Sequence, residues 1–204
     1  MEKELDIYYD HYKDTFSWLR KYLNARDKYF RYLVFLMAVL LLNSWLPSDF
    51  TKVTQIILKK NIGISDFSNF MLIDSLLLFS ILSVSIKYFQ SNLIIERQYS
   101  YLHHIEKKLS GKLNHFNVFR EGKAYLSDYP IFSSIVHRIY TIAFPALLII
   151  LVVYKWIYIL KSVNILGFFW FDTMVSLSII LLTLCYLTWI HFRDFKKCRK
   201  NKNS

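Results

Sequence analysis

The sequence predicts an all-α integral membrane protein with four transmembrane helices, both termini in the cytoplasm and a small cytoplasmic helical region. The 204-residue chain is 54% hydrophobic and 18% aromatic, yet its formal net charge is +11. Its apolar residues gather in four long runs, and its basic residues gather mainly outside them. Only four Gly and three Pro occur, which favours long helices over a many-turned β architecture.

The four apolar runs have the length of membrane spans. A helix needs about 20 mainly apolar residues to cross roughly 30 Å of hydrocarbon. We predict spans at 29–47, 67–89, 135–158 and 165–192. A soluble helical core is the weaker interpretation, because four such helices would leave no amphipathic shell to cover them. The acidic N-terminal segment does not have the form of a secretion signal.

Basic residues set the orientation of these spans. Of the 26 Lys and Arg, 21 lie before the first span, between the second and third, after the fourth, or within the inner ends of the spans, as Arg31, Lys87 and Arg138 do. The other five are Lys52, Lys59, Lys60, Lys155 and Lys161. Basic segments stay on the cytoplasmic side, so we expect a multi-pass membrane protein with both termini and the long central loop in the cytoplasm. The segments outside the spans are then cytoplasmic at 1–28, 90–134 and 193–204 and external at 48–66 and 159–164.

Two apolar stripes at helical spacing lie in the cytoplasmic segments. The first consists of Leu5, Tyr8, Tyr12, Phe16, Leu19 and Leu23; the second consists of Leu102, Ile105, Leu109, Leu113 and Phe116. Steps of three and four residues predict two amphipathic helices. We expect the two stripes to pack together, within one chain or between subunits. No proline occurs between Pro47 and Pro130, so the second span can continue into the cytoplasm as one helix.

Two aspartates lie inside predicted spans and share a local pattern. Phe70 to Ser75 (FMLIDS) resembles Phe168 to Thr173 (FFWFDT). This would correspond to a parallel repeat; the alternative is a chance match, which is common between apolar segments. A charge costs about 3 kcal/mol at the centre of a span, so both aspartates should face protein or water. One hypothesis is a water-accessible cavity or pore lined by Asp74, Ser80, Asp172 and Ser178. The alternative is that the aspartates only hold helices together through hydrogen bonds.

A set of basic residues could bind a partner or anionic lipid headgroups. The set consists of Arg97, Lys107, Lys108, Lys112, Arg120, Lys196, Lys197, Arg199 and Lys200. Juxtamembrane cations of this kind commonly contact headgroups. Direct binding of nucleic acid is not expected, because no folded groove accompanies the tail cluster.

The sequence contains no catalytic or cofactor-binding motif that we recognise. It has no P-loop, no Gly-rich dinucleotide turn and no nucleophile elbow. Arg97 and His103 form an R-x5-H arrangement that resembles the signature of HEPN ribonucleases, but those enzymes pair two such motifs and this chain has one. Adjacent His103 and His104 point in different directions on a helix, which argues against a metal site. We therefore expect a protein without enzymatic activity, cofactor or metal.

The architecture as a whole resembles that of membrane effectors from bacterial antiphage operons. Similar four-span proteins are accessory proteins of type VI-B CRISPR loci and effectors of cyclic-nucleotide immune systems. The resemblance covers the whole chain and rests on the four spans, the internal termini and the cytoplasmic helical hairpin. It implies a homo-oligomer that permeabilises or depolarises the inner membrane in antiviral defence when a cytosolic immune component signals infection.

Two other functions fit the same segments. A membrane scaffold would recruit a cytosolic protein or ribonucleoprotein through the basic cytoplasmic face without moving ions. A small transporter would use the parallel repeat, although no span has the Gly/Pro interruption typical of discontinuous transporter helices.

Overall fold

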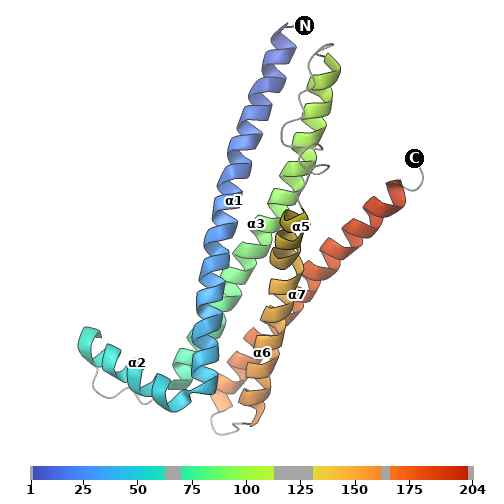
Figure 1. Cartoon of the computed structure of the whole chain (residues 1–204). Coiled ribbons are helices and arrows are strands. Elements are labelled where there is room, and N and C mark those ends of the chain that lie inside the picture. Colours follow the sequence, from blue (N-terminus) through green and yellow to red (C-terminus); the bar gives the residue numbers. More distant parts are fainter. Residues whose placement is uncertain (1, 63–69, 113–130, 162–165, 202–204) are drawn as a thin grey trace. The chain divides into compact units, whose positions relative to one another are not determined.

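The computed structural model describes residues 2–62, 70–112, 131–161 and 166–201. Every described residue except Leu46 is helical, and this part of the chain contains no strand. The all-α class is therefore confirmed. The elements in chain order (Figure 1) are α1 (Glu2–Trp45), α2 (Pro47–Ile62), α3 (Phe70–Lys112), α5 (Ile131–Arg138), the π-helix η1 (Ile139–Ala143), α6 (Phe144–Lys161) and α7 (Leu166–Asn201).

Two helices are unusually long. α1 has 44 residues and α3 has 43, and neither contains a proline. α3 confirms that the second predicted span continues without a break, as far as Lys112. Gly111 interrupts nothing, because a glycine costs a helix only about 1 kcal/mol.

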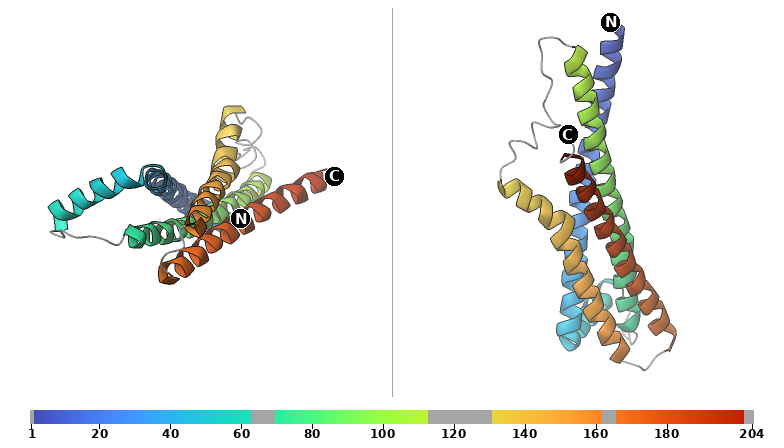
Figure 2. Two further views of the ribbon diagram at one scale, coloured as in Figure 1. Left: turned by 90° about the horizontal axis from the view of Figure 1, so that it is seen from below. Right: turned by 90° about the vertical axis from the view of Figure 1, so that its right-hand side faces the viewer.

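α1 ends where Pro47 begins the next helix. Proline disfavours helical geometry in the residue before it but suits the first position of a helix. Backbone hydrogen bonds flank this break, since Leu46 N donates to Leu42 O and Phe50 N donates to Leu46 O, both at 2.9 Å. The two helices meet at a bend of 118°, which Figure 2 shows from a second direction. α2 is not among the predicted elements, since the sequence indicates only an external connection at 48–66.

A second proline shapes the third predicted span. Pro145 lacks an amide hydrogen, and its ring clashes with the carbonyl oxygen four residues earlier in a regular helix. The π-helix Ile139–Ala143 immediately precedes it, and this wider turn accommodates the ring. α6 then runs to Lys161 and packs along α7, as the short connection between them requires (Figures 1 and 2).

Several helices are long and apolar enough to cross a membrane. Three described stretches qualify alone, namely Leu72–Gly111, Ile135–Leu160 and Phe168–Ile190. The pair Asp6–Trp45 and Pro47–Asn61 adds a fourth only if the two bent helices count as one span. The structure thus has three such helices, or up to four, and they indicate a membrane protein. The predicted first span lies in the bent pair, so the number four stays a prediction.

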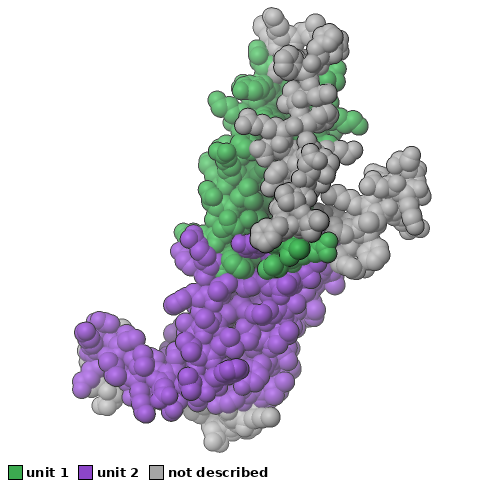
Figure 3. All heavy atoms as spheres, viewed as in Figure 1, with its two compact units in different colours: residues 1–30, 87–139 green, residues 31–86, 140–204 purple. Residues whose placement is uncertain are grey.

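The chain divides into two compact units (Figure 3). Unit 1 comprises 1–30 and 87–139, and unit 2 comprises 31–86 and 140–204. α1 and α3 each contribute to both units. The divisions fall close to the predicted inner ends of the first three spans, which were residues 29, 89 and 135.

Unit 1 is built on the two predicted stripes. Leu19 of α1 packs with Ile95 and Leu102 of α3, and all three are buried. Tyr12, Phe16, Tyr22, Leu23 and Tyr99 surround them. The expected packing is therefore confirmed within one chain for Tyr12, Phe16, Leu19 and Leu23 of the first stripe with Leu102 of the second. Ile105 and Leu109 of the second stripe are buried. Leu113 and Phe116 lie outside the described residues, as does the side chain of Leu5.

Removing the centre of this core should destabilise unit 1. Leu102 is fully buried, so Leu102→Ala should cost about 2–5 kcal/mol by leaving a cavity. The matched control Ile7→Ala changes an exposed apolar residue of α1 and should cost less than about 0.5 kcal/mol. Chemical denaturation in mild detergent measures both. Equal losses for the two variants would contradict the packing described here.

Candidate functional site

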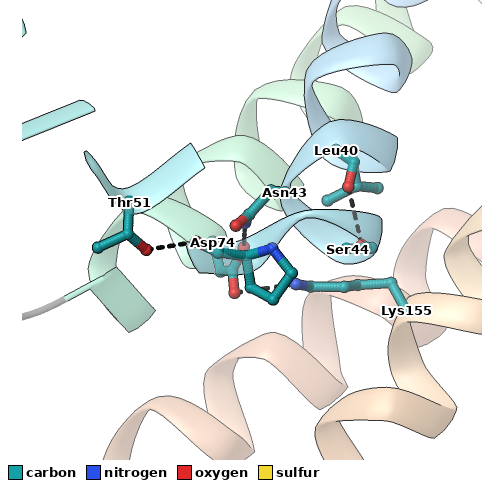
Figure 4. Close-up of polar contacts among 7 residues, drawn as sticks. Leu40, Asn43, Ser44, Thr51, Asp74 and Lys155 are labelled. Carbon is teal, nitrogen blue, oxygen red and sulfur yellow. Dashed lines mark hydrogen bonds and ion pairs between the residues drawn. The ribbon is translucent and has the colours of Figure 1, made fainter. Parts of the chain in front are cut away.

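Unit 2 holds a buried charged cluster that joins α1, α3 and α6. Asp74 of α3 lies between Asn43 of α1 and Lys155 of α6 (Figure 4). The Asn43 side-chain amide donates a hydrogen bond to Asp74 Oδ1. Lys155 Nζ donates to Asp74 Oδ2 at 2.9 Å. Both oxygens of the Asp74 carboxylate are therefore satisfied by side chains from other helices.

Lys155 is the most deeply placed member of the cluster. Its side chain is 2% exposed, against 21% for Asp74. Its ammonium nitrogen also lies 5.3 Å from the centroid of the Tyr158 ring, one turn later on α6. A cation over an aromatic face gains electrostatic stabilisation. An ammonium buried to this degree needs such partners, because desolvation of an unpaired ion costs several kcal/mol.

Asp172 of α7 adds a second carboxylate to the charged cluster. Asp172 is 5% exposed, and the Ser75 hydroxyl of α3 hydrogen-bonds to it. Asp74 and Lys155 are near enough to act on it electrostatically. Its Oδ1 atom has no hydrogen-bond partner among the described residues. Each of the helices α1, α3, α6 and α7 therefore contributes at least one polar or charged side chain to the cluster.

Helix topology brings these residues to one end of the unit. Asn43 lies two residues before the end of α1, and Asp74 lies four after the start of α3. Lys155 precedes the end of α6 by six residues, and Asp172 follows the start of α7 by six. α3 runs in the opposite direction to α1, and α7 runs in the opposite direction to α6 (Figure 1), so similar offsets from the helix ends place these side chains at similar heights along the helices.

The outward faces of the same helices are apolar. Phe35 of α1, Leu76 of α3, Ile150 of α6 and Leu181 of α7 are each more than half exposed. Unit 2 therefore buries charge and presents large hydrocarbon side chains. A soluble protein rarely exposes so continuous an apolar surface.

An apolar hollow of about 560 Å³ opens between α3 and α7. It is lined by Leu72, Ser75, Leu76, Phe79, Phe168 and Phe171. The rings of Phe79 and Phe171 lie 6.4 Å apart between centroids. Because Ser75 both lines this hollow and bonds to Asp172, the hollow reaches the edge of the charged cluster.

The structure places the four predicted pore-lining residues in different environments. The structure brings Asp74 and Asp172 together, but Ser178 is exposed and its hydroxyl donates to Met174 O at 2.8 Å. Ser80 is half-buried. Both serines follow their aspartate by six residues, which turns a helix side chain to about 120° from the aspartate face. Ser176, four residues after Asp172, shares its face and is fully buried.

The basic residues predicted to meet a partner or lipid fall mostly on unit 1. Arg97, Lys107 and Lys108 are exposed. Arg97 borders a hollow of about 260 Å³, whose other lining residues are His11, Asp14, Thr15, Trp18, Gln98 and Tyr101. Lys108 Nζ lies 5.7 Å from the Tyr8 ring centroid. Arg120 and the side chains of Lys112, Lys196, Lys197, Arg199 and Lys200 lie outside the described part of the structure.

Two members of the charged cluster were missed in the sequence. Asn43 is the first amide after an uninterrupted apolar stretch. A polar residue in this position could have indicated a member of the cluster. Lys155 was counted among the external basic residues although the predicted third span, 135–158, includes it. The structure buries Lys155 against Asp74. Without this buried lysine, the predicted orientation depends on 21 basic residues inside against four outside.

Comparison with known proteins does not assign the chain to a family. No family model, curated protein or solved structure matches it.

The Asp74–Lys155 pair should show strong energetic coupling. Asp74→Asn removes the carboxylate that pairs with Lys155, and Lys155→Met removes the cation that pairs with Asp74; breaking a buried pair from one side costs about 3–5 kcal/mol. The double variant should lose less than the sum by about 2 kcal/mol or more, because it removes both charges. The exposed pair Asp49 and Lys52, 3.7 Å apart, is the matched control and should couple by less than about 0.5 kcal/mol. Thermal unfolding in detergent measures the stability lost by the single and double variants of both pairs. Additive losses at Asp74 and Lys155 would rule out the pairing.

Proposed function

We propose that this chain is a four-span, non-enzymatic protein of the bacterial inner membrane with both termini in the cytoplasm. The distribution of Lys and Arg supports this orientation. The apolar outward faces of unit 2 support its placement in lipid, and the mixed polar surface of unit 1 supports its placement in water. In this arrangement α1 and the bend at Leu46 supply the first span, and α2 lies on the outer side.

The function we propose is controlled permeabilisation of that membrane. The observation that carries it is the charged cluster of Asn43, Asp74, Lys155 and Asp172, which is buried inside a unit with an apolar exterior. Ionisable groups at membrane depth are costly and usually serve an ion path, a relay or a switch. Simple helix packing can be achieved without charges, through small residues and hydroxyl groups.

The charged cluster can stabilise a closed state of unit 2 against an open state that contains water. While Asp74 is paired with Lys155, both charges are satisfied without water. Moving α3 away from α6 would leave two charges that only water can stabilise, so helix separation and water entry are coupled. Because α1 and α3 also form the core of unit 1, a partner that binds unit 1 can bias this equilibrium.

The biological setting we propose is antiphage defence, as the architectural resemblance implies. The protein would act as a homo-oligomer that depolarises the cell when a cytosolic immune component engages unit 1. Exposed Lys107 and Lys108 form a basic surface suited to that component. The same surface also favours the second candidate function, a scaffold that recruits a cytosolic partner and never moves ions.

The proposed orientation can be tested by cysteine labelling. In a chain with Cys185 and Cys198 replaced by Ser, Gln55→Cys on α2 should react with a membrane-impermeant maleimide in intact spheroplasts. Ser100→Cys on α3 should react only after the membrane is permeabilised. Both positions are exposed, so access to reagent is limited by the membrane alone. Labelling of Ser100→Cys in intact spheroplasts would contradict the orientation.

Stabilisation of the closed state by the charged cluster can be tested by reconstitution into liposomes. Lys155→Gln leaves Asp74 without its cation and should produce constitutive dye leak. Each 1.4 kcal/mol lost from the closed state raises the open population about tenfold, so leak should rise by at least about that factor. Lys52→Gln makes the same change at an exposed site and should leak no more than wild type.

Two results would count against permeabilisation. One is a folded Lys155→Gln protein whose liposomes are as tight as those of wild type. The other is loss of biological activity in Lys107→Glu/Lys108→Glu while no membrane-potential change is ever seen in challenged wild-type cells. The second result would favour the scaffold.

A further inference from the structure

The charged cluster contains more negative than positive charge. If every group is ionised, Asp74 and Asp172 contribute two negative charges and Lys155 contributes one positive charge. Asn43 and the two serines beside Asp172 are neutral. Asp74 already receives hydrogen bonds from Asn43 and Lys155, so the uncompensated charge falls on Asp172.

Two buried oxygens on one face of α7 lack partners. They are Asp172 Oδ1 and the Ser176 hydroxyl oxygen, neither of which has a hydrogen-bond partner among the described residues. Asp172 is 5% exposed and Ser176 is fully buried. Residues four apart lie on the same side of a helix, so Ser176 shares the face of α7 on which Asp172 is hydrogen-bonded to Ser75 of α3. Buried polar atoms are normally satisfied, and a group left open points to a missing ligand.

We propose that Asp172, Ser75 and Ser176 bind one monovalent cation, either a proton or Na⁺. Carboxylate and hydroxyl oxygens are ligands for hard cations, and one positive charge neutralises the charged cluster. A divalent ion would leave the cluster with an excess positive charge in an apolar unit. The titratable groups facing the site are Asp74 of α3 and Lys155 of α6.

This inference deepens the proposed function and rests on it for the placement of unit 2 in lipid. Occupancy of the site would stabilise the closed state, since an empty site leaves the excess negative charge buried. Binding is measured below through thermal stability, which requires no ion flux. The cation site and membrane permeabilisation can therefore fail separately.

The first test compares melting temperatures of purified protein in detergent. At constant pH and ionic strength, Na⁺ is added in place of N-methylglucamine; separately, in Na⁺-free buffer, the pH is lowered from mildly alkaline to mildly acidic. One of these changes should raise the wild-type melting temperature by about 3 °C or more, because a ligand bound only by the folded state stabilises it. A response to Na⁺ identifies Na⁺ as the ligand, and a response to pH alone identifies the proton.

Three variants assign the effect to the site. Asp172→Asn should abolish the response, and Ser176→Ala should weaken apparent Na⁺ affinity if Na⁺ is the ligand. Ser83→Ala is the matched control, because its exposed hydroxyl donates to Phe79 O on α3, and it should respond as wild type does. A wild type that responds to neither change, or an Asp172→Asn protein that responds as wild type does, overturns the proposal.

A second measurement covers the case in which Asp172→Asn does not fold. Dicyclohexylcarbodiimide reacts with a protonated carboxyl group: the acid O–H adds across a C=N bond, and the O-acylisourea rearranges to a stable N-acylurea. Asp172 should be labelled through the adjoining apolar hollow, whereas Asp74, paired with Lys155, should not. Labelling should fall as pH rises, and Na⁺ should protect if it is the ligand. Equal labelling of both aspartates, or no adduct on Asp172 under any condition, overturns the proposal.

Discussion

Every charge inside the apolar unit needs a partner from another helix, and this requirement organises unit 2. Asp74 meets it with Asn43 on one side and Lys155 on the other. Neither partner is close in sequence, so the carboxylate can be satisfied only when α1, α3 and α6 are assembled together. A buried pair of this kind adds little net stability, but disrupting it is costly. It therefore specifies one arrangement of helices more strongly than apolar contacts do.

α1 and α3 bury and expose different kinds of side chain in the two units. In unit 1, α1 and α3 bury one apolar stripe, as Leu19 and Leu102 show, and expose charged faces. In unit 2, the same two helices expose apolar residues such as Phe35 and Leu76, and α3 buries the polar residues Ser75 and Ser85. This reversal occurs without a break in either helix. It gives each helix one part that a cytosolic partner can reach and another that holds the charged cluster.

The local resemblance between the segments around Asp74 and Asp172 does not extend to their environments. Asp74 has two donors from other helices, whereas Asp172 receives one from Ser75 and keeps an unpartnered oxygen. The difference comes from Lys155 and Asn43, which lie outside the repeated segment. Two similar segments can thus hold one carboxylate in an ion pair and leave an oxygen of the other without a hydrogen-bond partner among the described residues.

The sequence by itself determined the helical class, the lengths of the apolar runs and the stripes that form unit 1. These are properties of neighbouring residues, because a run of apolar side chains or a period of three and four reports the solvent on each side of a helix. The tertiary structure alone decided that Lys155 faces Asp74, that Ser176 rather than Ser178 accompanies Asp172, and that 47–62 forms a helix. The partners of a buried charge depend on how each helix is rotated and how deeply it lies against the others. Those relations join residues as far apart as Asn43 and Lys155, and no local pattern encodes them.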